Sequence, residues 1–241
     1  MNLSAPKGKL IVLEGIDGSG KSAQYRRICE KLKRDGVRYD HIVFPRYDCE
    51  SSALIRLYLS GAFGDHPDDV NAYTASAFFA VDRFASFKQD WGEKYIGGSV
   101  ILADRYTTSN AVHQGSKLPE NELNDFFAWL SDFEYVKMGL PKPDLVIYLD
   151  VDIELSVARM RRREAKNGTH ADIHEKDIDY LTRCLATARK AAEYYGWHKI
   201  PYLKDGVERD LNEKNDEIYD LIVSCLDLQK EGAAWQKIWK K

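Results

Sequence analysis

The sequence predicts an α/β fold, in which a single doubly wound domain has a mainly five-stranded parallel sheet with helices on both faces. Short apolar runs alternate with longer segments of helical periodicity, a pattern typical of parallel βαβ units. A glycine-rich segment joins the first apolar run to the first helical segment. The chain shows no internal repeat, no low-complexity linker and no break in composition that would mark a second domain. We therefore expect one domain over residues 1–241.

Five apolar runs are expected to form the strands of this sheet. They span residues 10–13, 41–44, 100–103, 145–149 and 199–203. Pro45 ends the second run, because proline cannot donate a hydrogen bond to a neighbouring strand. Pro201 lies inside the last run, which indicates an edge strand or the end of a strand.

Helical periodicity fills the segments between these runs. The first helix carries Tyr25, Ile28 and Leu32 on one face and is expected to end at Gly36. A long helix rich in alanine and phenylalanine is expected from about residue 69 to residue 89. A third apolar stripe runs from Ile178 to Tyr195. These faces would cover the sheet.

The composition excludes several classes of protein. The 35 basic and 38 acidic residues give a net charge of −3, which argues against binding nucleic acid through bulk positive charge. Aromatic residues make up 12% of the chain, too many for intrinsic disorder. No apolar run reaches the roughly 18 residues that span a bilayer. The cysteines lack C-x-x-C spacing and the N-terminus lacks an apolar signal segment, so we expect a cytoplasmic protein with free thiols and no membrane partner.

The glycine-rich segment fits the phosphate-binding pattern G-x-x-x-x-G-K-[ST]. Its residues are Gly15, Ile16, Asp17, Gly18, Ser19, Gly20, Lys21 and Ser22. Backbone N–H groups of such a loop and of the following helix surround phosphate oxygens. Lys21 would add positive charge at the β- and γ-phosphates of ATP, and Ser22 a hydroxyl ligand for Mg²⁺. A simple glycine turn would account for the glycines but not for Lys21 and Ser22.

The chain contains no N-K-x-D motif, which guanine-nucleotide switches use to read their base. Among proteins with a phosphate-binding loop, a small kinase is the class that remains, and such a kinase needs an acceptor site. Asp104 directly follows the third apolar run, at the edge of the sheet where open α/β folds bind ligands. We expect Asp104 to hold Mg²⁺, although Asp150 follows the fourth run in the same way and Asp104 could instead cap a helix. Of the two aspartates, we prefer Asp104 as the metal ligand because Arg105 follows it directly, and a guanidinium beside a carboxylate suits a phosphate site.

These motifs together resemble those of the thymidylate kinase family. The matching segments are Glu14 to Ser22, Phe44 to Tyr47, Phe79 with Arg83, Asp104 to Asn110, and Leu140 to Leu145. The resemblance covers roughly residues 8 to 210. It implies the nucleoside monophosphate kinase fold of the P-loop NTPases and transfer of the γ-phosphoryl group of ATP to dTMP, giving dTDP, with Mg²⁺ required. It also suggests a homodimer packed through helices.

The resemblance further implies a role for each matching residue. The catalytic residues would be Lys21, Arg46, Asp104, Arg105, Arg161 and Arg162. The substrate would be bound by Asp17, Arg46, Phe79, Arg83, Arg105, Tyr106, Ser109, Asn110 and His113, and the metal by Ser22 and Asp104. Taken alone, Phe79 would be a core residue and Arg83 a surface charge paired with Asp82. Their four-residue spacing places them on one helix face, where one ligand can touch both.

Three features stand apart from the common pattern. Some family members carry a basic residue in the loop, but Gly18 and Ser19 stand at those positions here. The arginine-rich segment at about residues 159–177 is therefore expected to form a lid. The alternative is that this segment is a solvated helix end. A C-terminal extension at about residues 229–241 carries Trp235 and Trp239. Relatives often have tyrosine where His113 and His174 stand. We expect both imidazoles near the nucleoside, where they could weaken the preference for deoxyribose and gain charge in mild acid.

Two other functions remain open from the sequence. One is a deoxynucleoside kinase or another monophosphate kinase on the same fold. The other is a non-catalytic nucleotide-binding module that docks a partner through its C-terminal tail. Arg46 and Arg105 favour a phosphorylated acceptor, because a nucleoside acceptor needs a carboxylate base rather than two arginines that hold an anion.

Overall fold

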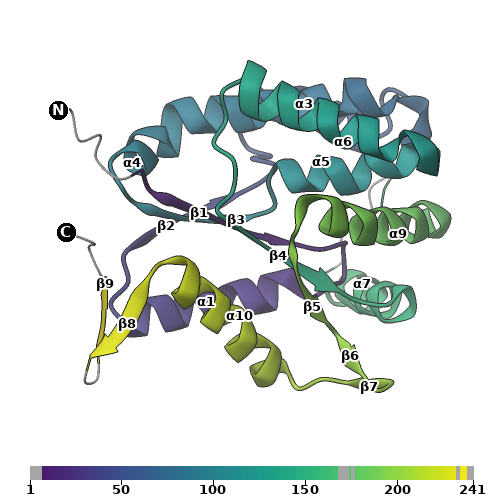
Figure 1. Cartoon of the computed structure of the whole chain (residues 1–241). Helices are drawn as coiled ribbons and strands as arrows, with labels where there is room; N and C mark the ends of the chain where they lie inside the picture. The colour runs from purple at the N-terminus through teal and green to yellow at the C-terminus, as the bar shows by residue number, and fades with distance from the viewer. Residues whose placement is uncertain (1–6, 168–173, 175–176, 232–233, 238–241) are drawn as a thin grey trace.

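Five parallel strands form the central sheet in the order β2-β3-β1-β4-β5 (Figure 1). The computed structural model describes residues 7–167, 174, 177–231 and 234–237. The strands are β1 (Lys9–Glu14), β2 (Tyr39–Val43), β3 (Val100–Asp104), β4 (Leu145–Asp150) and β5 (His198–Pro201). Each apolar run that predicted a strand therefore forms one, and the α/β fold class is confirmed. β5 is an edge strand, as Pro201 predicted.

The register brings the carboxyl ends of the central strands together. β1 pairs with β3 so that Leu13 lies opposite Asp104, and with β4 so that Glu14 lies opposite Tyr148. Alternate residues of β1 point to opposite faces of the sheet. Both sets are buried: Leu10 and Val12 belong to one core cluster, and Ile11 and Leu13 to another.

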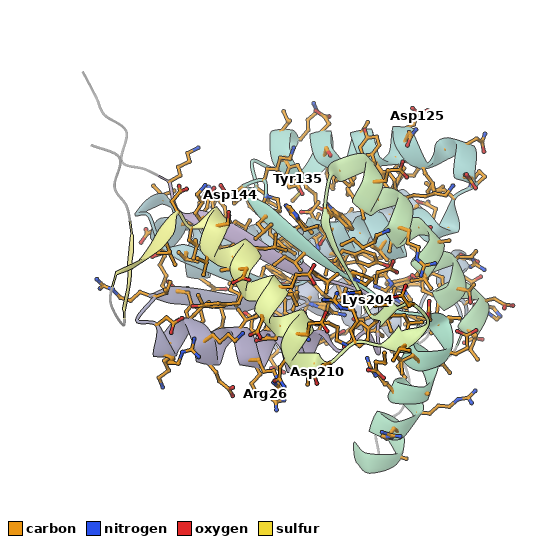
Figure 2. All side chains as sticks on the ribbon, turned by 60° about the horizontal axis from the view of Figure 1, so that its bottom comes forward. Arg26, Asp125, Tyr135, Asp144, Lys204 and Asp210 are labelled. Atoms are coloured by element: carbon orange, nitrogen blue, oxygen red, sulfur yellow. The ribbon has the colours of Figure 1, made fainter. Side chains whose placement is uncertain are left out.

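Helices cover both faces of this sheet. They are α1 (Lys21–Arg34), α2 (Ala53–Leu59), α3 (Ala72–Ser86), α4 (Gly92–Ile96), α5 (Thr107–His113), α6 (Leu123–Ser131), α7 (Ile153–Asn167), α9 (Ile178–Tyr195) and α10 (Leu211–Cys225). Figure 1 shows α3, α5, α6 and α9 on one side of the sheet and α1 and α10 on the other. Arg26 of α1 and Asp125 of α6 accordingly lie at opposite outer sides of the molecule (Figure 2). The long helix expected over residues 69–89 is α3, continued by a π-helical segment, η3 (Phe87–Trp91).

Side-chain caps begin α3, α9 and α10 but not α1. The side chains of Asn71, Asp177 and Asp210 cap α3, α9 and α10 by accepting hydrogen bonds from backbone N–H groups in the first turn. Each such cap stabilises its helix by about 1 kcal/mol. α1 instead starts after Gly20, which has a left-handed backbone and no capping side chain. The first N–H groups of α1 are thus left for a ligand.

Two short antiparallel hairpins complete the described chain. β6 (Leu203–Lys204) pairs with β7 (Val207–Glu208), and β8 (Leu228–Glu231) pairs with β9 (Ala234–Lys237). The second hairpin lies in the predicted C-terminal extension, whose Trp239 is outside the described residues. Across the described parts of the chain, no helix has both the length and the apolar character needed to cross a membrane.

Candidate active site

The glycine-rich loop between β1 and α1 borders a cleft of about 280 Å³, here called the loop cleft. Its walls are Asp17 to Ala23, Val43, Phe44, Asp104, Arg105, Arg159 and Met160. Gly18 and Gly20 have φ angles of 75° and 88°, which side-chain-bearing residues rarely adopt. A Cβ atom would also collide with Ser156 at the first position and with Tyr202 at the second. The loop is therefore closely packed from outside.

Lys21 lies buried within this loop. Its Nζ donates hydrogen bonds to the carbonyl oxygens of Gly15, at 2.6 Å, and Ile16, at 3.1 Å. Burial lowers the pKa of Lys21, and the nearby Arg105 guanidinium acts in the same direction. An incoming anion would relieve both effects, because it would return an opposite charge to the ammonium group.

Asp104, rather than Asp150, lies in the loop cleft. Asp104 lines the cleft together with Ser22, whose hydroxyl-bearing side chain is exposed at the start of α1. Burial raises the pKa of Asp104, while Lys21 and Arg105 oppose this rise. Asp150 instead accepts a hydrogen bond of 2.9 Å from Nε of Arg189. One carboxylate and one hydroxyl beside a phosphate-binding loop fit Mg²⁺, which is usually bound through one or two carboxylates and completed by phosphates and water.

A second cleft, of about 260 Å³, adjoins the first and is here called the aromatic cleft. It shares Asp17, Phe44 and Arg105 with the loop cleft. Eight of the nine predicted substrate-binding residues line it: Asp17, Phe79, Arg83, Arg105, Tyr106, Ser109, Asn110 and His113. Further lining residues include Pro45, Tyr47, Leu59, Gln114 and His174. Two ligands bound in the two clefts would thus meet at Arg105.

Arg105 is fixed between the two clefts. Its φ of 68° is unusual for a residue with a side chain, and its guanidinium is held on several sides. Nη2 donates to Oδ1 of Asp17 at 2.6 Å, and Nη1 lies 3.3 Å from Oγ of Ser109 and 3.1 Å from Nε2 of His113. Burial alone would raise the pKa of Asp17, but Arg105 and Lys21 outweigh it and hold that pKa well below its usual range. Asp17 is therefore ionised.

Glu14 connects the loop to α5. This fully buried carboxylate accepts a hydrogen bond from the backbone N of Gly15 at 2.8 Å, and further ones from the hydroxyls of Thr108, at 2.6 Å, and Ser109, at 2.7 Å. Nη1 of Arg105 lies 3.6 Å from the same carboxylate. Sequence reasoning did not identify Glu14 as a site residue, although it directly precedes the first glycine of the loop.

Arg83 and Asn110 are held by a residue that the sequence motifs did not indicate, Glu134. Nε and Nη2 of Arg83 donate to the two oxygens of Glu134 at 2.6 and 2.5 Å, within η6 (Asp132–Lys137), another π-helical segment. Nδ2 of Asn110 donates to Glu134 at 2.9 Å and to the carbonyl oxygen of Ser76 at 3.0 Å. Arg83 is buried, so its interpretation as a surface charge paired with Asp82 is wrong.

The two histidines stand side by side in the aromatic cleft. The rings of His113 and His174 are nearly parallel, with centroids 5.5 Å apart. Burial lowers the pKa of His113 to about 4, helped by Arg105, and lowers that of His174 well below its usual range. These lowered pKa values oppose a gain of charge in mild acid, because burial favours the neutral imidazoles. Since Arg105 can only donate, Nε2 of His113 accepts.

Tyr106 and Phe79 supply apolar walls of the same cleft. Tyr106 is buried, and its hydroxyl donates to the carbonyl oxygen of Pro141 at 3.1 Å. Phe79 meets the ring of Tyr58 edge-on, with centroids 6.4 Å apart. Both side chains present apolar surface to whatever occupies the cleft, as a bound ring would require.

Three predicted catalytic arginines lie away from both clefts. Arg46 donates to Asp82 at 3.1 Å and to Asp90 at 2.5 Å, which directs it toward α3 and η3. Arg161 and Arg162 are exposed on α7. The catalytic roles of these arginines stay predictions.

A different arginine of α7, Arg159, lines the loop cleft. Its guanidinium lies 4.6 Å from the ring centroid of Tyr202 and donates to Glu208 at 2.7 Å. The side chain of Arg163 and most of the expected lid beyond α7 are outside the described residues.

Comparison with known proteins gives a consistent result. A profile of the family described as Thymidylate kinase matches residues 13–210. The chain is 33% identical to thymidylate kinase from Mycobacterium tuberculosis over 190 residues, which is 78% of this chain and 87% of the relative. It is 31% identical to a probable thymidylate kinase of Methanococcus maripaludis over 217 residues, 89% of this chain and 95% of the relative. Human thymidylate kinase is 33% identical over 151 residues, 63% of this chain and 65% of the human protein.

Proposed function

Because the chain belongs to the thymidylate kinase family, we propose that it transfers the γ-phosphoryl group of ATP to dTMP and that the two clefts hold these two substrates. One observation carries the assignment of the clefts: the loop cleft and the aromatic cleft join at Asp17 and Arg105. ATP phosphates in the loop cleft and the dTMP phosphate in the aromatic cleft would then face each other across Arg105.

The aromatic cleft offers a hydrogen-bonding pattern that complements thymine. Both amide hydrogens of Asn110 are donated to groups that only accept, so its oxygen is left as an acceptor. Nε and Nη2 of Arg83 are held by Glu134, whereas Nη1 makes only a long contact of 3.4 Å to the carbonyl oxygen of Tyr106 and has a second hydrogen to donate to a ligand. Thymine offers an N3–H donor next to an O4 acceptor, which matches this pair. Cytosine would place an amino donor against Arg83.

The chemistry needs charge and position more than it needs a general base. The acceptor oxygens of a phosphate monoester are already largely ionised near neutral pH. Phosphoryl transfer then depends on alignment and on neutralising the charge that spreads over the transferred group. Lys21 and Arg105 are proposed to supply this charge from opposite sides. This accounts for the fixed cations that line the two clefts.

Mg²⁺ is the proposed cofactor, held by Ser22 and Asp104. The metal would bridge and neutralise ATP phosphate oxygens. Asp104 would serve as its carboxylate, directly or through water, and Ser22 would place its hydroxyl at the start of α1. The described residues contain no group of three or more histidine, cysteine or acidic side chains suited to a metal. A site of this kind does not need one, because the nucleotide contributes ligands.

Arg46, Arg161 and Arg162 are proposed to join the site when both nucleotides are bound. None of the three lines either cleft, so each would need to change its side-chain position. Lid arginines that arrive only on closure act on kcat rather than on nucleotide affinity. The remaining sequence-based assignments, Phe79 against the base and Tyr106 under the sugar, agree with the lining of the aromatic cleft.

A homodimer is proposed on the outer face formed by α3 and α6. Tyr73 and Val81 of α3 are exposed, and so is Val136, which follows α6. Tyr73 packs against Trp129 of α6 at 4.7 Å between ring centroids. These residues expose apolar side chains, and the family resemblance points to a second copy as their partner. Val81→Asp should halve the mass measured in solution; an unchanged mass would refute this interface.

A cytoplasmic location is proposed as well, supported by four cysteines that are all free thiols.

Release of ADP with a panel of acceptors tests the proposed function. dTMP should be used, dCMP should be disfavoured at least about a hundredfold in kcat/KM, and thymidine should not be used. Lys21→Ala should abolish most turnover with an unchanged melting curve. Preferential use of thymidine would favour a deoxynucleoside kinase, and no turnover with any acceptor would favour a nucleotide-binding module.

A further inference from the structure

A half-buried lysine, Lys117, has no part in the chemistry described so far. Lys117 ends η4 (Gly115–Lys117), the 3₁₀ turn that follows α5. Its Nζ donates to the hydroxyl of Tyr58 at 2.9 Å and to the carbonyl oxygen of Val70 at 2.8 Å. The same ammonium group lies 4.9 Å from the centroid of the Tyr58 ring. Lys117 is thus held by Tyr58 of α2 and by the backbone at Val70.

The hydroxyl of Tyr58 contacts His174 as well as Lys117. It lies 3.2 Å from the carbonyl oxygen of Pro67 and 2.8 Å from Nε2 of His174. The carbonyl oxygen can only accept, so it takes the hydroxyl hydrogen. The hydroxyl oxygen then accepts from Lys117 on one side and from Nε2–H of His174 on the other. This arrangement gives each of these three contacts of the hydroxyl one donor and one acceptor.

Tyr180 supports the same assignment from the opposite side of the imidazole. Its hydroxyl donates to the carbonyl oxygen of His113 at 2.8 Å and lies 3.4 Å from Nε2 of His174. Because that hydroxyl hydrogen is also committed to a carbonyl, its oxygen can only accept from His174. Two hydroxyl oxygens therefore face the Nε2–H group, and they fix the plane of the ring.

His174 is the point at which this network reaches the ligand-binding wall. It lies in the segment expected to form the lid, and it lines the aromatic cleft. Its ring stacks on His113, which in turn accepts from the Arg105 guanidinium. A continuous series of contacts therefore runs from Lys117 through Tyr58, His174 and His113 to the arginine at the junction of the clefts.

We propose that Lys117 is a positioning residue for the acceptor nucleotide, acting through the Tyr58 hydroxyl to hold His174 in the wall of the aromatic cleft. This inference rests on the proposed function, because it assigns the acceptor to that cleft. Lys117 itself is separated from the acceptor by Tyr58 and His174. It should therefore affect the affinity for the acceptor and leave the transfer step nearly untouched.

The charge of Lys117 gives the network a dependence on pH. Burial lowers the pKa of Lys117 to about 8, while Asp68 and Cys184 oppose this effect. The other charged or titratable groups around it are His174, Tyr58, Tyr180 and Arg183, which pairs with Asp68 at 2.8 Å. As pH rises through about 8 the ammonium loses its proton, and its hydrogen bonds lose their charge assistance. The acceptor KM should rise over that interval.

A double-mutant cycle tests the proposal. Lys117→Met should raise the KM for dTMP about five- to tenfold, the effect of one lost hydrogen bond, with kcat and the KM for ATP changed less than about twofold. Tyr58→Phe should do the same, and the double variant should be no worse than Tyr58→Phe alone. Lys117→Arg, which keeps the charge, should restore most of the affinity. The rise in KM near pH 8 should be absent from Lys117→Met.

Lys94→Met is the matched control, because Lys94 makes a single exposed ion pair with Asp40 at 2.5 Å and should leave all constants unchanged. Additive effects in the cycle, or an equal fall in kcat and kcat/KM, would overturn the proposal. If Lys117→Met fails to fold, Tyr58→Phe and Lys117→Arg provide the same comparison.

The wild-type panel keeps a failure of the proposed function separate. If another monophosphate proves to be the acceptor, the cycle is measured with that nucleotide. If no acceptor is turned over, the readout becomes the dissociation constant of dTMP, with the same pattern expected across the variants and the same additivity overturning the proposal.

Discussion

Replacing Glu134 by glutamine tests how the base-recognising part of the aromatic cleft is built. The carboxylate of Glu134 is fully buried and accepts four hydrogen bonds. One oxygen receives Nε of Arg83 and the hydroxyl of Thr107, and the other receives Nη2 of Arg83 and Nδ2 of Asn110. Each oxygen thus faces two donors, and the negative charge balances the buried guanidinium.

Glu134→Gln keeps the shape of this side chain but removes its charge and one acceptor. In either orientation, the new NH₂ group faces an Arg83 nitrogen that also donates. The variant therefore leaves a buried guanidinium without its counter-charge, which costs about 3–5 kcal/mol of unfolding free energy. For a chain of this length, that corresponds to a fall in Tm of about 6–20 °C. The KM for dTMP should rise more than about tenfold, because Arg83 and Asn110 both lose their support.

Denaturant unfolding and steady-state kinetics measure the two effects together. Asp132→Asn is a suitable control, since Asp132 lies in the same π-helical segment and makes only an exposed ion pair with Lys137, at 3.0 Å. It should change stability by less than about 0.5 kcal/mol. If Glu134→Gln unfolds at the wild-type midpoint and binds dTMP normally, the argument that Glu134 orients Arg83 and Asn110 is refuted.

Three further predictions concern the loop cleft and the histidines. Arg159→Met should reduce turnover at least as much as Arg161→Met or Arg162→Met, because Arg159 is the one of these three that lines the loop cleft. A larger loss in either of the others would show that the transfer charge comes from them rather than from Arg159. Ser22→Ala should raise the Mg²⁺ concentration needed for half-maximal activity, and an unchanged requirement would remove Ser22 from the metal site. The folded pKa of His113, about 4, lies below its unfolded value of about 6.5, so its contribution is fully present above pH 6.5 and is lost as pH falls toward 4. Urea unfolding measures the free energy of unfolding at pH 7 and at pH 5. The decrease between these two pH values should be about 2 kcal/mol smaller in His113→Gln than in wild type, and equal decreases would contradict this role of His113.

The sheet and the loop could be predicted from the sequence because their signals are local. A fully buried parallel strand is a short apolar run, and all five runs form strands. The loop pattern combines glycine backbone freedom with a lysine and a hydroxyl at fixed spacing, so no distant residue is needed to recognise it. Asp104 followed from a topological rule, since the carboxyl ends of β1 and β3 meet at one edge of the sheet.

The partners of the arginines could not be predicted in this way. Glu134 lies 51 residues from Arg83, in a π-helical segment that carries no motif. Sequence proximity suggested Asp82 for Arg83, but neighbouring residues on a helix point about 100° apart. Asp82 therefore meets Arg46, while Arg83 turns into the core. Which arginine of α7 reaches the loop cleft depends in the same way on the rotation of that helix against the sheet.

Across both clefts, buried or partly buried carboxylates hold the cations that the proposed reaction uses. Glu14 and Asp17 flank Arg105, and Glu134 clamps Arg83. The carboxylate in each pair weakens the electrostatic attraction between the guanidinium and a phosphate. A guanidinium without a carboxylate partner, however, would be costly to bury and free to rotate. A hydrogen-bond donor that is already fixed requires little reorganisation when negative charge develops on the transferred phosphoryl group. Such preorganised donors usually make the largest electrostatic contribution to catalysis. The same argument explains why Arg105 can remain charged at a junction largely removed from water, and why Lys117 can influence acceptor affinity through Tyr58 and His174 without touching the acceptor.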